Sequence, residues 1–174
     1  MTLRTIGLLL ILLLGVARAT AERVTRHEVL AAIAVLEKDV TSADALRAAE
    51  VVTRFGKESD AVLITIGTET MPWVQLDTPE TEAPVRALLM AAYFAGDIKS
   101  QLEKRRPVDD PYSGWLATIT AYRQIRKKQP GMVIPEVEEL IKKEQTGTLK
   151  DEAEELNKQQ KEDHQREQRP TNLV

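Results

Sequence analysis

The sequence predicts an all-α protein: a single-domain bundle of about five helices that follows a cleaved signal peptide and precedes a charged C-terminal tail. Apolar residues recur at helical spacings of three and four along most of the chain. Proline, glycine and capping residues separate these stretches. The chain has no cysteine, so a hydrophobic core has to supply its stability. We expect a signal peptide over 1–21, a helical domain over 22–156 and a charged tail, helical or disordered, over 157–174.

The first 21 residues have the three parts of a secretory signal peptide. Arg4 precedes the apolar run Ile6–Val16, and small residues follow it. A run of roughly 11 residues is shorter than the about 20 that a bilayer span needs. The sequence allows cleavage after Ala19 or, slightly favoured, after Ala21. The expected location is the periplasm or the exterior of the cell. An uncleaved N-terminal membrane anchor is the alternative.

The predicted mature chain is mildly acidic. Removing Arg4 and Arg18 with the leader leaves 22 basic side chains against 27 acidic ones, a net charge of −5. This balance gives no support to nucleic-acid binding, which needs a concentrated positive face. The two histidines form no metal-binding motif, and no glycine-rich phosphate loop follows a strand. We therefore predict no cofactor and no metal.

Local signals define each predicted helix in turn. Thr25 and Glu28 have the spacing of a capping box, and the next helix starts after Asp44 and stops near Gly56. The first apolar stripe comprises Val29, Ile33, Leu36 and Val40, and the second comprises Leu46, Ala49, Val52 and Phe55. A very short connection predicts an antiparallel hairpin of these two helices.

The remaining helices begin at prolines. The third, the predicted centre of the fold, begins near Thr81 with Pro84 in its first turn and is apolar on most sides. Asp109, Asp110 and Pro111 open the fourth, with an acidic cap before the proline. Pro135 opens the fifth, which Gly147 breaks or bends. Leu149, Ala153 and Leu156 continue a thin apolar stripe beyond that glycine.

Residues 59–73 are ambiguous. The sequence Val62–Ile66 is rich in β-branched residues, which favour strands. The chain offers no second convincing strand, and a lone strand would leave its backbone groups unpaired. We predict an extended segment or a short helix, and a loop over 78–82.

Three carboxylates are candidates for chemistry. A pair of carboxylates can run a glycosidase, and Asp97, Asp109 and Asp110 are the candidates for a hydrolase acting on cell-wall glycans. Helix capping explains the adjacent pair Asp109 and Asp110 more simply, because acidic residues stabilise the positive end of a helix. No serine or histidine lies in the sequence context of a catalytic triad.

Three aromatic residues at segment junctions are candidates for contact with a partner: Trp73, Tyr112 and Trp115. Residues of this kind more often fix loops onto a core. The leading functional prediction is an exported, non-catalytic protein of the cell envelope that acts through protein–protein contacts, with the tail 157–174 as its foremost contact segment. The hydrolase is one alternative. A membrane-tethered protein that keeps its leader is another.

Overall fold

The computed structural model describes residues 23–74 and 82–167, without the side chains of 163–165 and 167. The leader and the cleavage sites after Ala19 and Ala21 therefore lie outside the described residues, as does most of the 78–82 loop. The described residues form helices and connecting loops and include no strand, which confirms the all-α prediction. They form six helices: α1 (Arg26–Lys38), α2 (Ala45–Glu58), α3 (Ala83–Lys104), α4 (Pro111–Lys128), α5 (Pro135–Thr146) and α6 (Leu149–Glu167).

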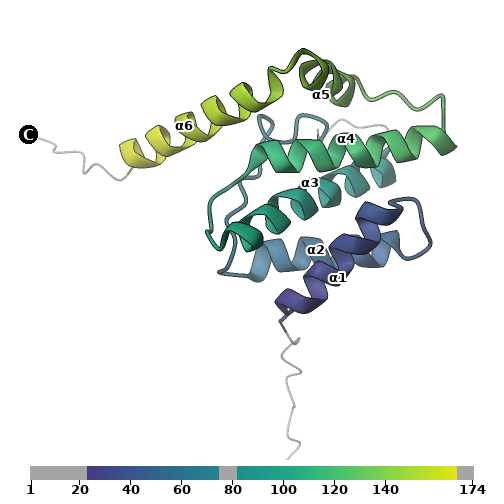
Figure 1. Cartoon of the computed structure of the whole chain (residues 1–174), viewed down its shortest axis with the longest axis horizontal. Coiled ribbons are helices and arrows are strands. Elements are labelled where there is room, and N and C mark those ends of the chain that lie inside the picture. The colour runs from purple at the N-terminus through teal and green to yellow at the C-terminus, as the bar shows by residue number, and fades with distance from the viewer. Residues whose placement is uncertain (1–22, 75–81, 168–174) are drawn as a thin grey trace, which may run out of the picture.

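Helices α3 and α4 form the middle of the molecule (Figure 1). Helices α1 and α2 pack together on one side of this pair, whereas α5 and α6 pack on the other side against α4 and each other. As predicted, α3 is buried on most of its surface. Glycines bring α3 and α4 together: a Cβ at Gly96 would lie 2.3 Å from the carbonyl oxygen of Ser113, and one at Gly114 would lie 2.5 Å from the Tyr93 ring.

The capping box that begins α1 is present as predicted. The Thr25 hydroxyl accepts a hydrogen bond from the Glu28 N–H, and the Glu28 carboxylate accepts one from the Thr25 N–H at 2.7 Å. These bonds satisfy two of the N–H groups that a helix start otherwise leaves free.

Helix α2 differs from the prediction in two ways. It does not stop at Gly56 but continues to Glu58. The absence of a side chain at Gly56 instead makes room for Ile64, whose Cδ1 would lie 2.8 Å from an added Cβ. Leu46, predicted to face inward, is 66% exposed, because Ala45 and Ala48 occupy the buried face of the first turns.

A break at Gly147 separates α5 from a sixth helix, α6, which the sequence did not predict as a separate element. The φ of 78° at Gly147 is left-handed, so the chain ends α5 there and begins α6 two residues later. The predicted stripe of Leu149, Ala153 and Leu156 is buried and fixes the first half of α6 to the body. The helix continues to Glu167, well past the last buried apolar residue (Figure 1). Among the described residues no helix combines the length and hydropathy needed to cross a bilayer.

The segment Val62–Ile66 is neither helix nor strand. The side-chain amide of Gln101 on α3 donates to the Leu63 carbonyl at 2.7 Å and accepts from the Leu63 N–H at 2.9 Å. Because one amide reaches both groups, they point to the same side, as they do in an extended chain. The extended form of the prediction is therefore correct, and a side chain takes the place of the missing neighbouring strand.

Candidate functional site: a buried carboxyl cluster beside a basic cleft

The three carboxylates selected from the sequence lie together where α3 meets the start of α4. Asp97 is on α3, and the loop between α3 and α4 supplies Asp109 and Asp110. Asp97 is fully buried and Asp109 is 5% exposed. The Asp97 and Asp109 carboxyl groups lie within hydrogen-bonding reach of each other. Sequence reasoning placed these residues in one set, and the fold brings them into one cluster.

Both carboxylate oxygens of Asp110 accept hydrogen bonds. One of its carboxylate oxygens accepts a hydrogen bond from the Ser113 N–H, which caps α4 as predicted. The other accepts bonds from the hydroxyls of Ser100 and Ser113 and from the Lys104 ammonium. Burial alone would raise the pKa of Asp110, but these donors outweigh it and lower the pKa below its usual value. Asp110 is therefore ionised at neutral pH.

Asp109 does not cap α4, contrary to the simpler interpretation of the pair. Neither of its carboxyl oxygens has a donor in bonding geometry among the described residues, and the same holds for Asp97 Oδ2. Asp97 Oδ1 accepts from the Gln101 amide at 2.7 Å and from the Asp110 N–H at 2.9 Å. The two carboxyls thus face each other through their unsatisfied oxygens.

This arrangement requires a shared proton. Burial, a hydrogen bond with Asp109 and the charge of Asp109 raise the pKa of Asp97 to about 8. Burial likewise raises the pKa of Asp109. Two ionised carboxylates in contact, with no cation bonded to either of their facing oxygens, would be strongly disfavoured. At neutral pH the pair therefore holds one proton between its members.

Tyr93 completes the cluster, and sequence reasoning missed it. Burial and the carboxyls of Asp109, Asp97 and Asp110 raise the pKa of its phenol, so Tyr93 stays neutral. Its ring lies 6.1 Å from that of Trp73. Nothing in the local sequence marks Tyr93, because its role depends on contacts made by the loop after α3.

A cleft of about 560 Å³ lies beside this cluster, between the start of α4 and α6. We call it the α4–α6 cleft. Tyr112, Val108 and Ala153 contribute apolar surface to it, and its charged lining includes Lys104, Arg106, Asp110, Lys150, Glu154 and Lys161. Asp109 also borders the cleft, but its carboxyl oxygens are shielded from solvent.

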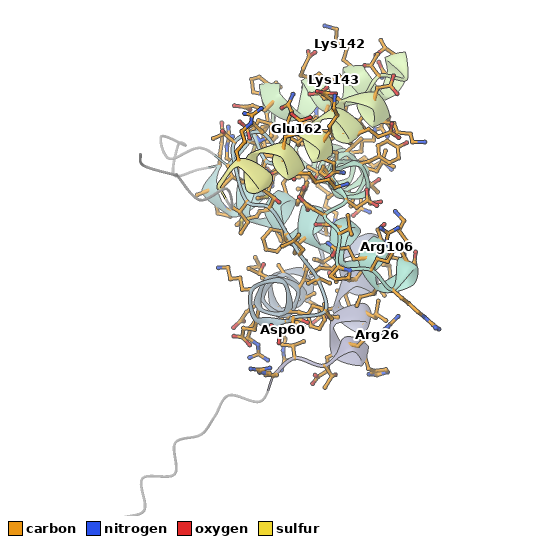
Figure 2. All side chains as sticks on the ribbon, turned by 90° about the vertical axis from the view of Figure 1, so that its left-hand side faces the viewer. Arg26, Asp60, Arg106, Lys142, Lys143 and Glu162 are labelled. Atoms are coloured by element: carbon orange, nitrogen blue, oxygen red, sulfur yellow. The ribbon has the colours of Figure 1, made fainter. Side chains whose placement is uncertain are left out.

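The basic groups of the cleft fall into two kinds. Lys104 is paired with Asp110 at 2.6 Å, and Lys150 lies 3.8 Å from Glu154. Arg106 and Lys161, both exposed, form no ion pair with any of the side chains that the structure describes. Figure 2 shows Arg106 at the surface, with its side chain directed outward. The cleft therefore has uncompensated positive charge on both of its walls.

The predicted aromatic contact residues occupy two different environments. Trp73 and Trp115 are buried in the core, and the Trp115 indole N–H donates to the Thr70 carbonyl at 2.7 Å. These two side chains fix the 59–74 loop. Tyr112 is partly exposed in the α4–α6 cleft.

Comparison with known proteins yields no relative. No family model matches the chain, and neither a curated sequence nor a solved structure is significantly similar to it. Within the described residues, no group of three or more His, Cys, Asp or Glu side chains is arranged to hold a metal ion.

Proposed function

We propose that this protein is an exported, non-catalytic helical protein of the cell envelope that binds another protein through the α4–α6 cleft. The observation that carries the proposal is the composition of that cleft: unpaired positive charge at Arg106 and Lys161 beside apolar surface from Val108 and Tyr112. An acidic partner segment with one apolar side chain has the complementary chemistry. Export follows from the signal-peptide pattern of residues 1–21.

The length of α6 supports this assignment. Its last buried apolar residue is Leu156, yet the helix continues to Glu167. Gln160 reaches the Thr65 hydroxyl only at 3.4 Å, so the second half of α6 adds little to the packing of the body. It does place Lys161 on the wall of the cleft. The sequence predicts that the segment 157–174 contacts a partner. Two residues at the start of this segment, Asn157 and Lys161, line the cleft.

Site-specific photocrosslinking in intact cell envelopes tests the proposal. A photoreactive residue at Tyr112 should give a discrete crosslinked product, whereas one at Leu46, exposed on α2, should not. Arg106→Glu with Lys161→Glu should reduce the Tyr112 product at least tenfold. The matched reversal Arg47→Glu with Lys127→Glu, two exposed basic residues outside the cleft, should leave it unchanged.

A truncated chain separates the tail from the body. A chain ending at Leu156 lacks Lys161 but keeps the buried stripe of α6, so we expect it to fold and to lose the crosslink. Retention of every contact by this chain would show that the tail plays no part. If no crosslink forms at Tyr112 in the full chain, the proposed function is wrong.

A hydrolase acting on cell-wall glycans is a second candidate, and one observation favours it. Asp109 and Asp110 border the same cleft, with pKa values displaced in opposite directions, as an acid and a base require. Against it, the Asp109 oxygens are shielded and Asp110 is saturated with donors, so neither is free to meet a substrate. Glycan release that is undiminished after alanine substitution at Asp97, Asp109 and Asp110 together would eliminate this candidate.

The mass of the mature chain distinguishes export with cleavage from membrane tethering. A product beginning at residue 20 or 22 corresponds to cleavage after Ala19 or Ala21. A product that keeps residues 1–21 corresponds to a tethered protein.

A further inference from the structure

The loop between α3 and α4 has one attachment that depends on a proton. It leaves α3 at Arg105, whose φ of 54° is left-handed, and returns to the body at Asp109. Between them Arg106 and Val108 are exposed and form part of one wall of the α4–α6 cleft. The Asp109 carboxyl faces Asp97 on α3, and the Thr65 N–H and hydroxyl lie near enough to lower its pKa but outside hydrogen-bonding geometry.

We propose that the proton shared by Asp97 and Asp109 is a latch that holds this loop closed against α3, and that its loss to solvent in mildly alkaline solution opens that wall of the cleft. The regulatory consequence rests on the proposed binding function of the cleft, whereas the movement itself does not.

No described cation around the pair is placed to replace the proton. From α3, Tyr93 offers a neutral phenol, and the Lys104 ammonium is engaged by Asp110. Asp110 itself, at the start of α4, is a third acid. From the 59–74 segment, Thr65 is uncharged, and its N–H and hydroxyl lower the pKa of Asp109 without outweighing the effect of burial. Lys150 and Lys161 of α6 line the facing side of the cleft but form no hydrogen bond or ion pair with either carboxyl.

Deprotonation therefore leaves two buried carboxylates in contact. Because buried like charges repel strongly and desolvation penalises both, the pair must separate or take up water. The pKa of Asp97, raised to about 8, sets the range in which this occurs.

Asp109 is the member that moves. Asp97 lies within a long helix in the core, and its Oδ1 is held by Gln101 and by the Asp110 N–H. These donors stabilise an ionised carboxylate in place. Asp109 lies in a loop, and the Thr65 N–H and hydroxyl beside it fall outside hydrogen-bonding geometry, so it is held less firmly than Asp97. Separation therefore displaces Asp109 and with it the neighbouring Val108.

Two spin labels across the cleft measure the movement directly. The absence of cysteine allows a clean Val108→Cys and Asn157→Cys pair, since both residues line the cleft from opposite sides. We expect the distance distribution from pulsed electron paramagnetic resonance to lengthen and broaden between about pH 6 and about pH 9.5, following the loss of a single proton. An unchanged distribution would overturn the proposal.

Asp109→Asn is the decisive variant. An asparagine amide has nearly the same shape and donates to an ionised Asp97 at every pH, so the label distance should stay at its low-pH value throughout. The matched control Asp151→Asn, exposed on α6, should titrate as the parent does. If the Asp109 variant does not fold, Asp97→Asn serves the same purpose. A pH response that persists in a folded variant of either residue would assign the movement to another group.

The crosslinking assay distinguishes this inference from the proposed function. If both hold, the product at Tyr112 falls above the transition in the parent but not in Asp109→Asn. If the label distance responds to pH and no crosslink forms at any pH, the latch is correct and the proposed function is wrong. If the crosslink forms but the label distance does not change with pH, the proposed function stands and the latch is wrong.

Discussion

The side-chain amide of Gln101 bonds both backbone groups of Leu63, 38 positions earlier in the chain, and also bonds the carboxylate of Asp97. One buried residue of α3 thereby joins the extended 62–66 segment to the carboxyl cluster. The segment has the composition of a strand, and Gln101 provides the pairing that a second strand would otherwise supply.

Replacement of Gln101 by leucine should destabilise the protein by about 2–4 kcal/mol, because the N–H and C=O of Leu63 and the buried carboxyl of Asp97 would all lose their hydrogen bonds to its amide. Urea unfolding followed by tryptophan fluorescence measures the change. Gln159→Leu, on the exposed side of α6, is the matched control and should stay within about 0.5 kcal/mol of the parent. Equal stabilities for the two variants would contradict the role assigned to Gln101.

Gly96→Ala should destabilise the protein by about 1–3 kcal/mol, although alanine is the better helix former. The added Cβ would lie 2.3 Å from the Ser113 carbonyl oxygen and 2.7 Å from the Ala117 Cβ, which would force α3 and α4 apart. Gly131→Ala meets no atom within 4 Å and should be neutral or mildly stabilising. Thermal unfolding by circular dichroism compares the two, and a stabilised Gly96 variant would disprove the close approach.

The Asp110 carboxylate should make an acid-sensitive contribution to stability. Its pKa is lowered in the folded protein, so the contribution is present above the unfolded pKa of about 3.9 and is lost as pH falls through the lower folded value. Asp110→Ala should cost about 1–2 kcal/mol at neutral pH, and the difference from the parent should shrink in acid.

Asp44 provides the matched control for this measurement. It occupies the residue before α2 but makes no side-chain capping bond. Urea unfolding at a series of pH values should show little cost for Asp44→Ala at any pH. A cost for Asp110→Ala that does not change between neutral and acidic solution would contradict the ionised cap.

Arg86 should resist conservative replacement. Its guanidinium donates to the Trp73 carbonyl and, through two nitrogens, to Glu82, and its side chain is only 12% exposed. A lysine cannot reproduce this fork, so Arg86→Lys should cost about 1–3 kcal/mol. Arg47→Lys at an exposed position of α2 should be neutral in the same unfolding assay.

Features set by neighbouring residues were predictable from the sequence. The capping box of Thr25 and Glu28, the cap at Asp110 and the glycine break at Gly147 each depend on a few consecutive residues, and the structure confirms all three. The helix-rich fold follows from the same signals. Leu46 shows the limit of periodicity, because alanines at 45 and 48 define an equally helical stripe and are the residues that face the core.

The carboxyl cluster was predictable only as a set of residues. Its defining property is the contact between Asp97 and Asp109, and that contact depends on the left-handed turn at Arg105. No local pattern indicates which of two adjacent aspartates caps a helix and which turns into the core. The contributions of Gln101 and Tyr93 depend on residues far along the chain, and periodicity carries no information about such pairs.

The hydrogen bonds between the Gln101 side chain and the backbone of Leu63 also affect how prone the chain is to aggregate. The sequence Val62–Ile66 is uncharged, free of proline and rich in β-branched residues, the composition of segments that stack into amyloid. In the folded protein Gln101 occupies the backbone groups of Leu63, whereas Leu63 and Ile66 keep exposed side chains. In an unfolded chain, or in a variant that lacks the Gln101 side chain, the backbone groups of Leu63 lose these hydrogen bonds and the segment is open to pairing with another copy. Folding of α3 is thus also the step that withdraws this aggregation-prone stretch from contact with other copies.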